Sequence, residues 1–170
     1  SSDVCSSDLL HLADGCRRAA QSVDRGKRAA RSHTVKGGHT DLEQLLRSME
    51  PELLDEVYAF CTIAPEQLNE LAVQPTLLFD EREGMTAILP KAEAERAGLD
   101  YAFPSRRITL TVHSSLDAVG FLAAVTGALA DADISVNAVS AFYHDHLFVP
   151  VLRAEEALQV LSALADAPAR

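Results

Sequence analysis

Residues 106–151 read RRITLTVHSSLDAVGFLAAVTGALADADISVNAVSAFYHDHLFVPV, and this stretch decides the fold. Residues 107–112 alternate apolar or β-branched side chains with threonines, which predicts a half-buried strand. Apolar residues then recur at spacings of three and four over residues 118–129, which predicts an amphipathic helix. A second strand is expected over residues 134–140 and a third over 147–152. The polar tip between these two strands is typical of an antiparallel hairpin.

The predicted helix has a recognisable start. Ser114 is followed three residues later by Asp117, just ahead of the apolar run, and this spacing is typical of a helix cap. We therefore expect residues 114–117 to cap the helix. Gly120 would fall in the first turn, where glycine costs about 1 kcal/mol relative to alanine. A close approach of a ligand or of a neighbouring strand would explain that glycine.

The preceding residues predict a second unit of the same kind. Thr40 and Glu43 have the spacing of a capping box before a short helix that ends ahead of Pro51. Strands are expected over residues 57–63, 76–79 and 85–89, and helices over residues 91–97 and 154–165. No strand follows the last helix, so the second half lacks one edge strand. We expect residues 57–63, or another strand of the first half, to complete its sheet.

Several motifs together resemble a known family. They are the DxxG of residues 117–120, ALADADISVNAVS, YHDHLFVP and the upstream FDEREGMT of residues 79–86. Together they resemble the ACT domain, and more narrowly the small bacterial proteins built from two ACT-like halves. The resemblance implies an α+β, ferredoxin-like βαββαβ sandwich with helices on one face of an antiparallel sheet. The two degenerate halves would span residues 40–103 and 104–170.

The resemblance also implies a site and a function. ACT domains bind small ligands, usually amino acids, at the turn between their first strand and first helix. The corresponding ligand-binding residues here are His113, Ser114, Ser115, Leu116, Asp117, Gly120, Asn137 on the second strand, and Asp145 at the hairpin tip. A helix N-terminus suits an α-carboxylate, and the Asp145 carboxylate suits an ammonium group. We therefore expect a non-catalytic, amino-acid-binding regulatory protein that forms a homodimer and needs no cofactor.

Other interpretations of the same residues stay open. Helix capping alone would explain Ser114, Ser115 and Asp117. His113, His144 and His146 would bind a divalent metal if they converged in one coordination shell. A structural or oligomerising module would bind no ligand at all. No nucleophile elbow, phosphate loop, HExxH or CxxC motif is present, so we expect no catalytic residues.

Composition excludes several classes of protein. The chain has 15 Lys and Arg residues against 25 Asp and Glu residues, a net charge of −10, and such a chain repels nucleic acid. No apolar run approaches the ~20 residues of a membrane-spanning helix. Three cysteines without paired spacing argue against a disulfide framework. We expect a soluble, cytoplasmic protein.

The N-terminal residues differ from the rest of the chain. Residues 1–40 carry seven basic and four acidic side chains, whereas residues 41–170 carry eight and 21. We expect residues 1–39 to be a non-native or disordered leader, and residues 1–9 resemble a translated sequencing adapter. The natural chain is expected to begin at Val35.

Overall fold

The computed structural model describes residues 40–167, so the expectations about residues 1–39 lie outside the described part of the chain. The α-helices are α2 (Leu42–Arg47), α3 (Lys91–Arg96), α4 (Phe121–Asp131) and α5 (Ala154–Ala165), and the 3₁₀ helices are η1 (Pro65–Glu70) and η2 (Val151–Arg153). The strands are β1 (Pro51–Ile63), β2 (Leu77–Glu81), β3 (Gly84–Pro90), β4 (Tyr101–Leu110), β5 (Asn137–Ser140) and β6 (Asp145–Pro150). Within residues 40–167, no helix is long and apolar enough to span a membrane.

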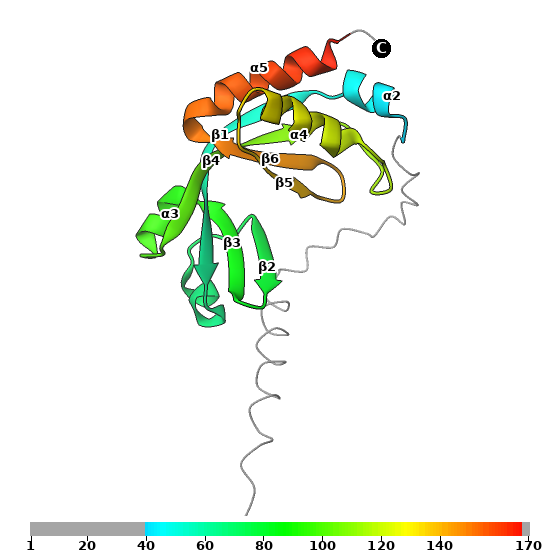
Figure 1. The fold of residues 1–170 in the computed structure, drawn as a ribbon. Helices are drawn as coiled ribbons and strands as arrows, with labels where there is room; N and C mark the ends of the chain where they lie inside the picture. The colour runs from blue at the N-terminus through cyan, green and yellow to red at the C-terminus, as the bar shows by residue number, and fades with distance from the viewer. Residues whose placement is uncertain (1–39, 168–170) are drawn as a thin grey trace, which may run out of the picture. The chain divides into compact units, whose positions relative to one another are not determined.

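The six strands form one antiparallel sheet in the order β2-β3-β1-β4-β6-β5 (Figure 1). The long central strands β1 and β4 belong to both halves. Residues 58–63 of β1 pair with β3, whereas residues 51–53 pair with residues 108–110 of β4. The start of β1 therefore supplies the strand that the second half lacks, which confirms that a first-half strand completes its sheet.

Strand β1 begins six residues before the predicted start at Val57. The register with β4 shifts between Leu53 and Val57, so the pairing is irregular there. Such an irregularity interrupts the two-residue alternation that a regular strand shows. The charged segment PELLDEV of residues 51–57 therefore lacks the sequence pattern of a strand. Most of it nevertheless pairs with β4 or lies between paired residues.

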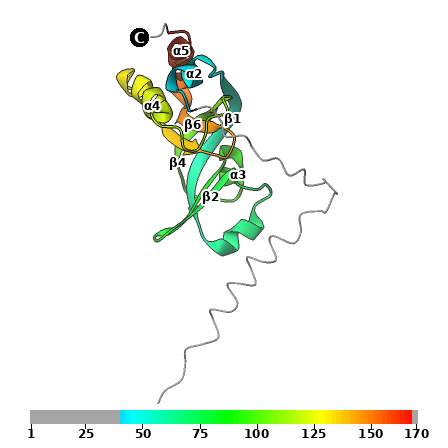
Figure 2. The same cartoon turned by 90° about the vertical axis from the view of Figure 1, so that its right-hand side faces the viewer.

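The helices lie on one side of the sheet, as predicted. Figure 2 shows α2, α4 and α5 grouped on the same side of β4 and β6. Their apolar side chains form a core with Ile108, Leu110, Leu147 and Val149. Helix α3 contributes Ala94 to a smaller core with alternate residues of β1 and β3. The α+β class and the antiparallel sheet are confirmed.

The opposite side of the sheet, called here the helix-free face, carries an aromatic cluster. Tyr58 and Phe148 are buried there together with Ile88. The rings of Tyr58 and Phe148 lie 5.6 Å apart in an edge-to-face arrangement, and Phe60 contacts Phe148 in the same way at 5.6 Å. Because β1 carries Tyr58 and Phe60 and β6 carries Phe148, this cluster joins the two halves.

Two predicted helix starts were wrong. Helix α4 begins at Phe121, and its N-cap is Gly120, so Ser114 does not cap it. The Ser115 hydroxyl instead accepts a hydrogen bond from the Asp117 N–H at 3.2 Å, which turns the chain within the loop. Helix α2 is capped by Asp41 rather than Thr40, because the Asp41 carboxylate accepts from the Gln44 N–H at 2.8 Å.

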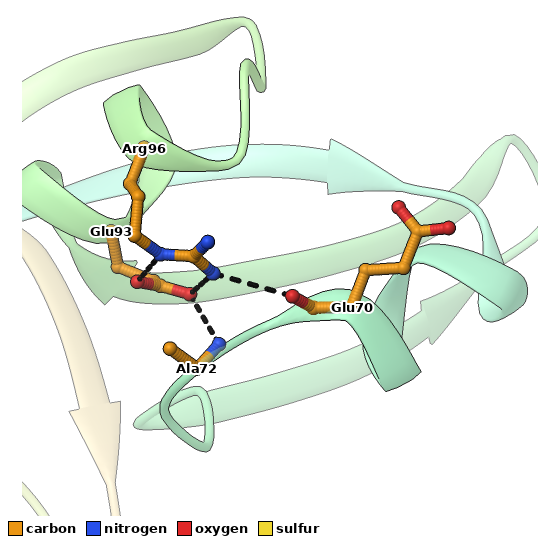
Figure 3. A network of polar contacts seen from close by, with 4 residues as sticks. All are labelled: Glu70, Ala72, Glu93 and Arg96. Atoms are coloured by element: carbon orange, nitrogen blue, oxygen red, sulfur yellow. Dashed lines mark hydrogen bonds and ion pairs between the residues drawn. The ribbon is translucent and has the colours of Figure 1, made fainter.

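In the first half, the segment after β1 is held against α3 by a buried acid (Figure 3). Glu93 of α3 accepts from the Ala72 N–H at 2.6 Å and pairs with Arg96 at 2.6 Å. Arg96 also donates to the Glu70 carbonyl at 3.2 Å. The hydrogen bond from Arg96, followed by that from Ala72, lowers the pKa of Glu93 to about 2. We call these four residues the Glu93 clamp.

Candidate functional site

A pocket of about 140 Å³ opens between the β4–α4 loop and the β5–β6 hairpin. It is lined by Ser114, Ser115, Leu116, Ala118, Gly120, Phe121, Leu122, Ala123, Ser140, Ala141 and Asp145. Pockets for drug-sized molecules measure roughly 300–1,000 Å³. A pocket of this size therefore suits a small metabolite.

Asp145 is the charged group of this pocket, and it is only 5% exposed. The Ser140 hydroxyl donates to one of its oxygens at 2.6 Å, and the Ser114 hydroxyl donates to the other at 3.2 Å. Among the described residues, no Lys, Arg or His lies within ion-pair distance of this carboxylate. A carboxylate has about four lone-pair sites, so two remain to accept hydrogen bonds from a cation.

The start of α4 supplies hydrogen-bond donors to the same pocket. The first backbone N–H groups of an α-helix have no acceptor within the helix, and the N-cap Gly120 has no side chain to offer one. The residues that carry these groups, Phe121, Leu122 and Ala123, line the pocket. The positive end of the helix dipole adds to their attraction for an anion. The pocket thus combines a buried carboxylate with free N–H donors.

Gly120 allows this arrangement because its φ is +91°. Side chains are strained in that left-handed conformation, whereas glycine adopts it readily. A Cβ at this position would lie 3.5 Å from the Leu42 side chain of α2, which is an ordinary contact. The backbone conformation therefore accounts for the glycine, whereas the close approach of a ligand that the sequence suggested stays a prediction.

The structure brings together only part of the predicted site. Ser114, Ser115, Leu116, Gly120 and Asp145 line the pocket, whereas His113, Asp117 and Asn137 do not. Asn137 pairs with Phe148, and Ser140 pairs with Asp145. Since paired residues of an antiparallel sheet share a face and successive residues alternate, the Asn137 side chain lies on the helix-free face, opposite Asp145.

The sequence analysis missed the pocket residues Ala118, Phe121, Leu122, Ala123, Ser140 and Ala141, and of these Ser140 is the one that hydrogen-bonds Asp145 through its side chain. The predicted hairpin placed Asp145 and His146 in the tip, but both belong to β6. The register that pairs Ser140 with Asp145 depends on this shorter tip of residues 141–144. The alternation of residues 134–140 contained part of the information needed to identify Ser140, because it places Ser140 and Asn137 on opposite faces of the strand.

The three candidate metal ligands do not converge. His146 Nδ1 lies 3.0 Å from the Thr109 hydroxyl, His144 Nδ1 lies 3.5 Å from the Val112 carbonyl, and the His113 ring is tilted against the Tyr143 ring with 6.2 Å between their centres. No group of three His, Cys, Asp or Glu side chains within residues 40–167 is arranged to hold a metal ion. Burial lowers the pKa of His146, and the charges of Arg107 and His144 lower it further.

Large apolar side chains next to the pocket are exposed. Leu116 and Val119 belong to the β4–α4 loop, and Phe142 and Tyr143 belong to the hairpin tip. Their exposed fractions range from 56% for Phe142 to 84% for Val119. Water contact is unfavourable for these surfaces, and clustered exposed apolar residues are typical of binding sites. We call these four residues the pocket rim.

Comparison with known proteins agrees with this architecture. A model of the ACT domain matches residues 37–106, and a second ACT-domain model matches residues 103–163. A solved Vibrio cholerae protein of unknown function, described as a possible transport protein, is 43% identical, with 73% of this chain and 95% of that chain covered and a TM-score of 0.66. No curated protein matches the chain.

Two more distant structures share the fold alone. An Agrobacterium tumefaciens protein is 15% identical over 69% of this chain and 89% of its own, with a TM-score of 0.55. The regulatory subunit of aspartate kinase from Thermus thermophilus is 13% identical over 67% of this chain and 95% of its own, with a TM-score of 0.53. The two family matches and the Vibrio relative together place this chain in the ACT-domain family, with two ACT domains that share one sheet.

Proposed function

We propose that the protein is a non-catalytic regulator that binds an amino acid in the pocket beside Asp145. The observation that carries this proposal is the buried Asp145 carboxylate, which has two hydroxyl donors but no basic partner among the described residues. Burying a charge is unfavourable unless it is paired and hydrogen-bonded. A ligand ammonium group would supply the missing positive charge.

The rest of the pocket fits the other end of an amino acid. The α-carboxylate accepts hydrogen bonds from the free N–H groups of Phe121, Leu122 and Ala123. The ammonium group donates to Asp145 and to the Ser140 hydroxyl. The ligand side chain points toward the pocket rim, where Leu116 offers an apolar contact. The pocket volume of about 140 Å³ restricts the ligand to a metabolite about as large as an amino acid.

The pocket rim also supports a homodimer. Its four exposed apolar side chains lie on two loops that flank the pocket, so a second copy that covers them would also close the pocket. Ligand binding and self-association would then be coupled. The regulatory role is supported by the fold shared with the regulatory subunit of aspartate kinase.

A thermal-shift screen of the full chain against the twenty amino acids tests the proposal. For a ligand of about ten heavy atoms we expect a Kd between micromolar and millimolar. At a hundred times its Kd it adds about 2.7 kcal/mol to the free energy of unfolding. We expect one amino acid, or a chemically related group of them, to raise the melting temperature by several degrees.

Two variants give the screen a matched control. Asp145→Asn removes the charge that holds the ammonium group, so the response should disappear. Asn137→Ala changes the same hairpin on its opposite face, so the response should remain. A response that survives Asp145→Asn would contradict the site, and a flat screen would contradict the function. A flat screen with concentration-dependent self-association would instead favour an interaction module without ligand.

A further inference from the structure

The charges of the pocket match the two charged groups of an amino acid backbone and leave no partner for a third charge. Asp145 is the only charged side chain among the described residues that line the pocket. The proposed function assigns Asp145 to the ligand ammonium and the free N–H groups of α4 to the ligand carboxylate. A second carboxylate on the ligand would meet no Lys, Arg or His among these lining residues, and a second ammonium would meet no second acid.

The hydroxyl groups of the pocket are already engaged by the protein. Those of Ser114 and Ser140 donate to Asp145 at 3.2 Å and 2.6 Å. The Ser115 hydroxyl accepts from the Asp117 N–H at 3.2 Å. A hydroxyl has one proton to donate, so of these three only Ser115 keeps its proton for a ligand. One neutral donor does not compensate for the burial of a charge.

The remaining side chains that line the pocket are apolar: Leu116, Ala118, Phe121, Leu122, Ala123 and Ala141. Leu116 is 69% exposed although it lines the pocket. A ligand side chain that covers Leu116 removes apolar surface of both partners from water, which is favourable when that side chain is itself apolar. Directly after Ala141, the rings of Phe142 and Tyr143 lie 4.9 Å apart in an edge-to-face arrangement, and they extend the apolar surface along the pocket rim.

We propose that the ligand is an amino acid with an uncharged, apolar side chain, such as leucine, and that Leu116 sets this specificity. This inference rests on the proposed function and names the class of its ligand. The side chain of the ligand packs against Leu116, while Asp145 and the start of α4 hold the ammonium and carboxylate groups. The net charge of the chain, −10, disfavours a dicarboxylic amino acid further, because an acidic protein repels a ligand with a net negative charge.

Amino acids of equal size and shape test the ligand class. Leucine, asparagine and aspartate have the same branching and the same number of heavy atoms, and they differ in the polarity and charge at the end of the side chain. Each is titrated at equal ionic strength into the ¹⁵N-labelled full chain, and the amide signals of Leu122 and Ala123 give its Kd. We expect asparagine to bind about tenfold more weakly than leucine, and aspartate more weakly still, because polar groups buried without partners are unfavourable.

Norleucine and ornithine make the same comparison for a terminal ammonium group, and we expect ornithine to bind more weakly. Equal or tighter binding of asparagine, aspartate or ornithine than of its apolar counterpart overturns the apolar class but leaves the amino-acid site standing. If none of the five shifts the two amide signals, the inference is overturned as well. The screen of the twenty amino acids then decides separately whether the proposed function stands.

A charge placed at Leu116 should change the preference. Leu116→Lys puts an ammonium group where the proposal places the ligand side chain, so aspartate should bind about tenfold more tightly than to the wild type, and leucine more weakly. Since Leu116 is exposed, we expect this variant to fold. If it does not fold, the wild-type titrations still decide the ligand class.

Asp117→Asn is the matched control for this variant. It changes the net charge by the same amount at the neighbouring residue, which is exposed and does not line the pocket. We expect Asp117→Asn to keep the preference for leucine. An unchanged preference in Leu116→Lys, or an equal gain of aspartate affinity in Asp117→Asn, contradicts the role of Leu116.

Discussion

The segments that follow β1 and β4 occupy the same place in the two ACT domains, yet they differ in what holds them. In the first domain, residues 64–76 contain the short helix η1, and the Glu93 clamp ties the end of η1 to α3 (Figure 3). In the second domain, residues 111–120 form a loop that lines a pocket with the uncompensated Asp145. The first domain neutralises its buried acid with Arg96, whereas the second leaves its acid without a base in the described chain.

The two domains nevertheless share one device. Arg153, just before α5, donates to the carbonyls of Ala132 at 3.1 Å and Asp133 at 3.3 Å, at the end of α4. Arg96 of α3 donates in the same way to Glu70 at the end of η1. A cation at a helix C-terminus is favourable because the last carbonyls are free and the dipole is negative there. In both domains an arginine thus binds the carbonyls at the end of the preceding helix. The domains differ in the segment that follows their first strand and in whether the buried acid has a basic partner.

The largest expected effect comes from the cluster that joins the domains. Phe148→Ala should lower the free energy of unfolding by about 3–5 kcal/mol, since it leaves a cavity beside Tyr58 and Phe60. Because β1 and β4 belong to both domains, we expect the two to unfold in one transition. Urea unfolding measures the loss, and hydrogen exchange of β3 and β6 amides measures whether both domains open together.

Phe142→Ala is the control for this variant, because Phe142 is exposed and its removal leaves no cavity in the core. We expect a change below about 0.5 kcal/mol for a surface substitution of this kind. If the Phe148→Ala variant keeps β3 protected while β6 exchanges, then the domains are independent and can be compared as separate units.

The next largest effect concerns the first domain alone. The pKa of Glu93 in the folded protein, about 2, lies below the value of about 4.3 expected in the unfolded chain. The clamp therefore contributes stability that is fully present above about pH 4.3 and is lost as the pH falls toward 2. Glu93→Gln should destabilise the protein at pH 7 and remove this part of the acid dependence, as measured by urea unfolding at pH 7, 4 and 3.

Hydrogen exchange locates the effect of this variant. The Ala72 amide donates to Glu93, so it should exchange faster in Glu93→Gln, whereas amides of the second domain should not change. Glu95→Gln breaks the exposed pair with Lys91 on the same helix and serves as the control with a smaller effect. Equal losses in the two variants would show that the clamp does not hold the segment after η1.

The smallest effects distinguish two glycines of the second domain. Gly120→Ala places a side chain at a φ of +91° and should lower the free energy of unfolding by about 1–3 kcal/mol. Gly127→Ala should instead raise it by up to about 1 kcal/mol, because Gly127 lies within α4 and a Cβ there meets nothing within 4 Å. Thermal unfolding of both variants measures the difference. A neutral Gly120→Ala would show that the left-handed turn does not shape the pocket.

Much of the fold could be predicted from local patterns. Helix α5 was predicted with the bounds it has, because its apolar side recurs without interruption over residues 154–165. The start of helix α4 was predicted too early, since the Ser114 and Asp117 spacing looks like a cap, whereas Asp117 donates to Ser115 in a turn of the loop and Ser114 donates to Asp145. Asp145, Ser114, Ser115, Leu116 and Gly120 were predicted as site residues and line the pocket, whereas Asn137 was placed on the wrong face.

The sequence by itself determined the α+β class, the order of most elements and the likeness of the two halves, because hydrophobic period and turn residues act over a few neighbouring positions. Only the tertiary structure decided which strand completes the second domain and which side chains share the pocket. These depend on strand register, and a shift of one residue moves every side chain of a strand to the other face. Register is set by pairing between residues as far apart in the sequence as Pro51 and Leu110, which no local pattern records.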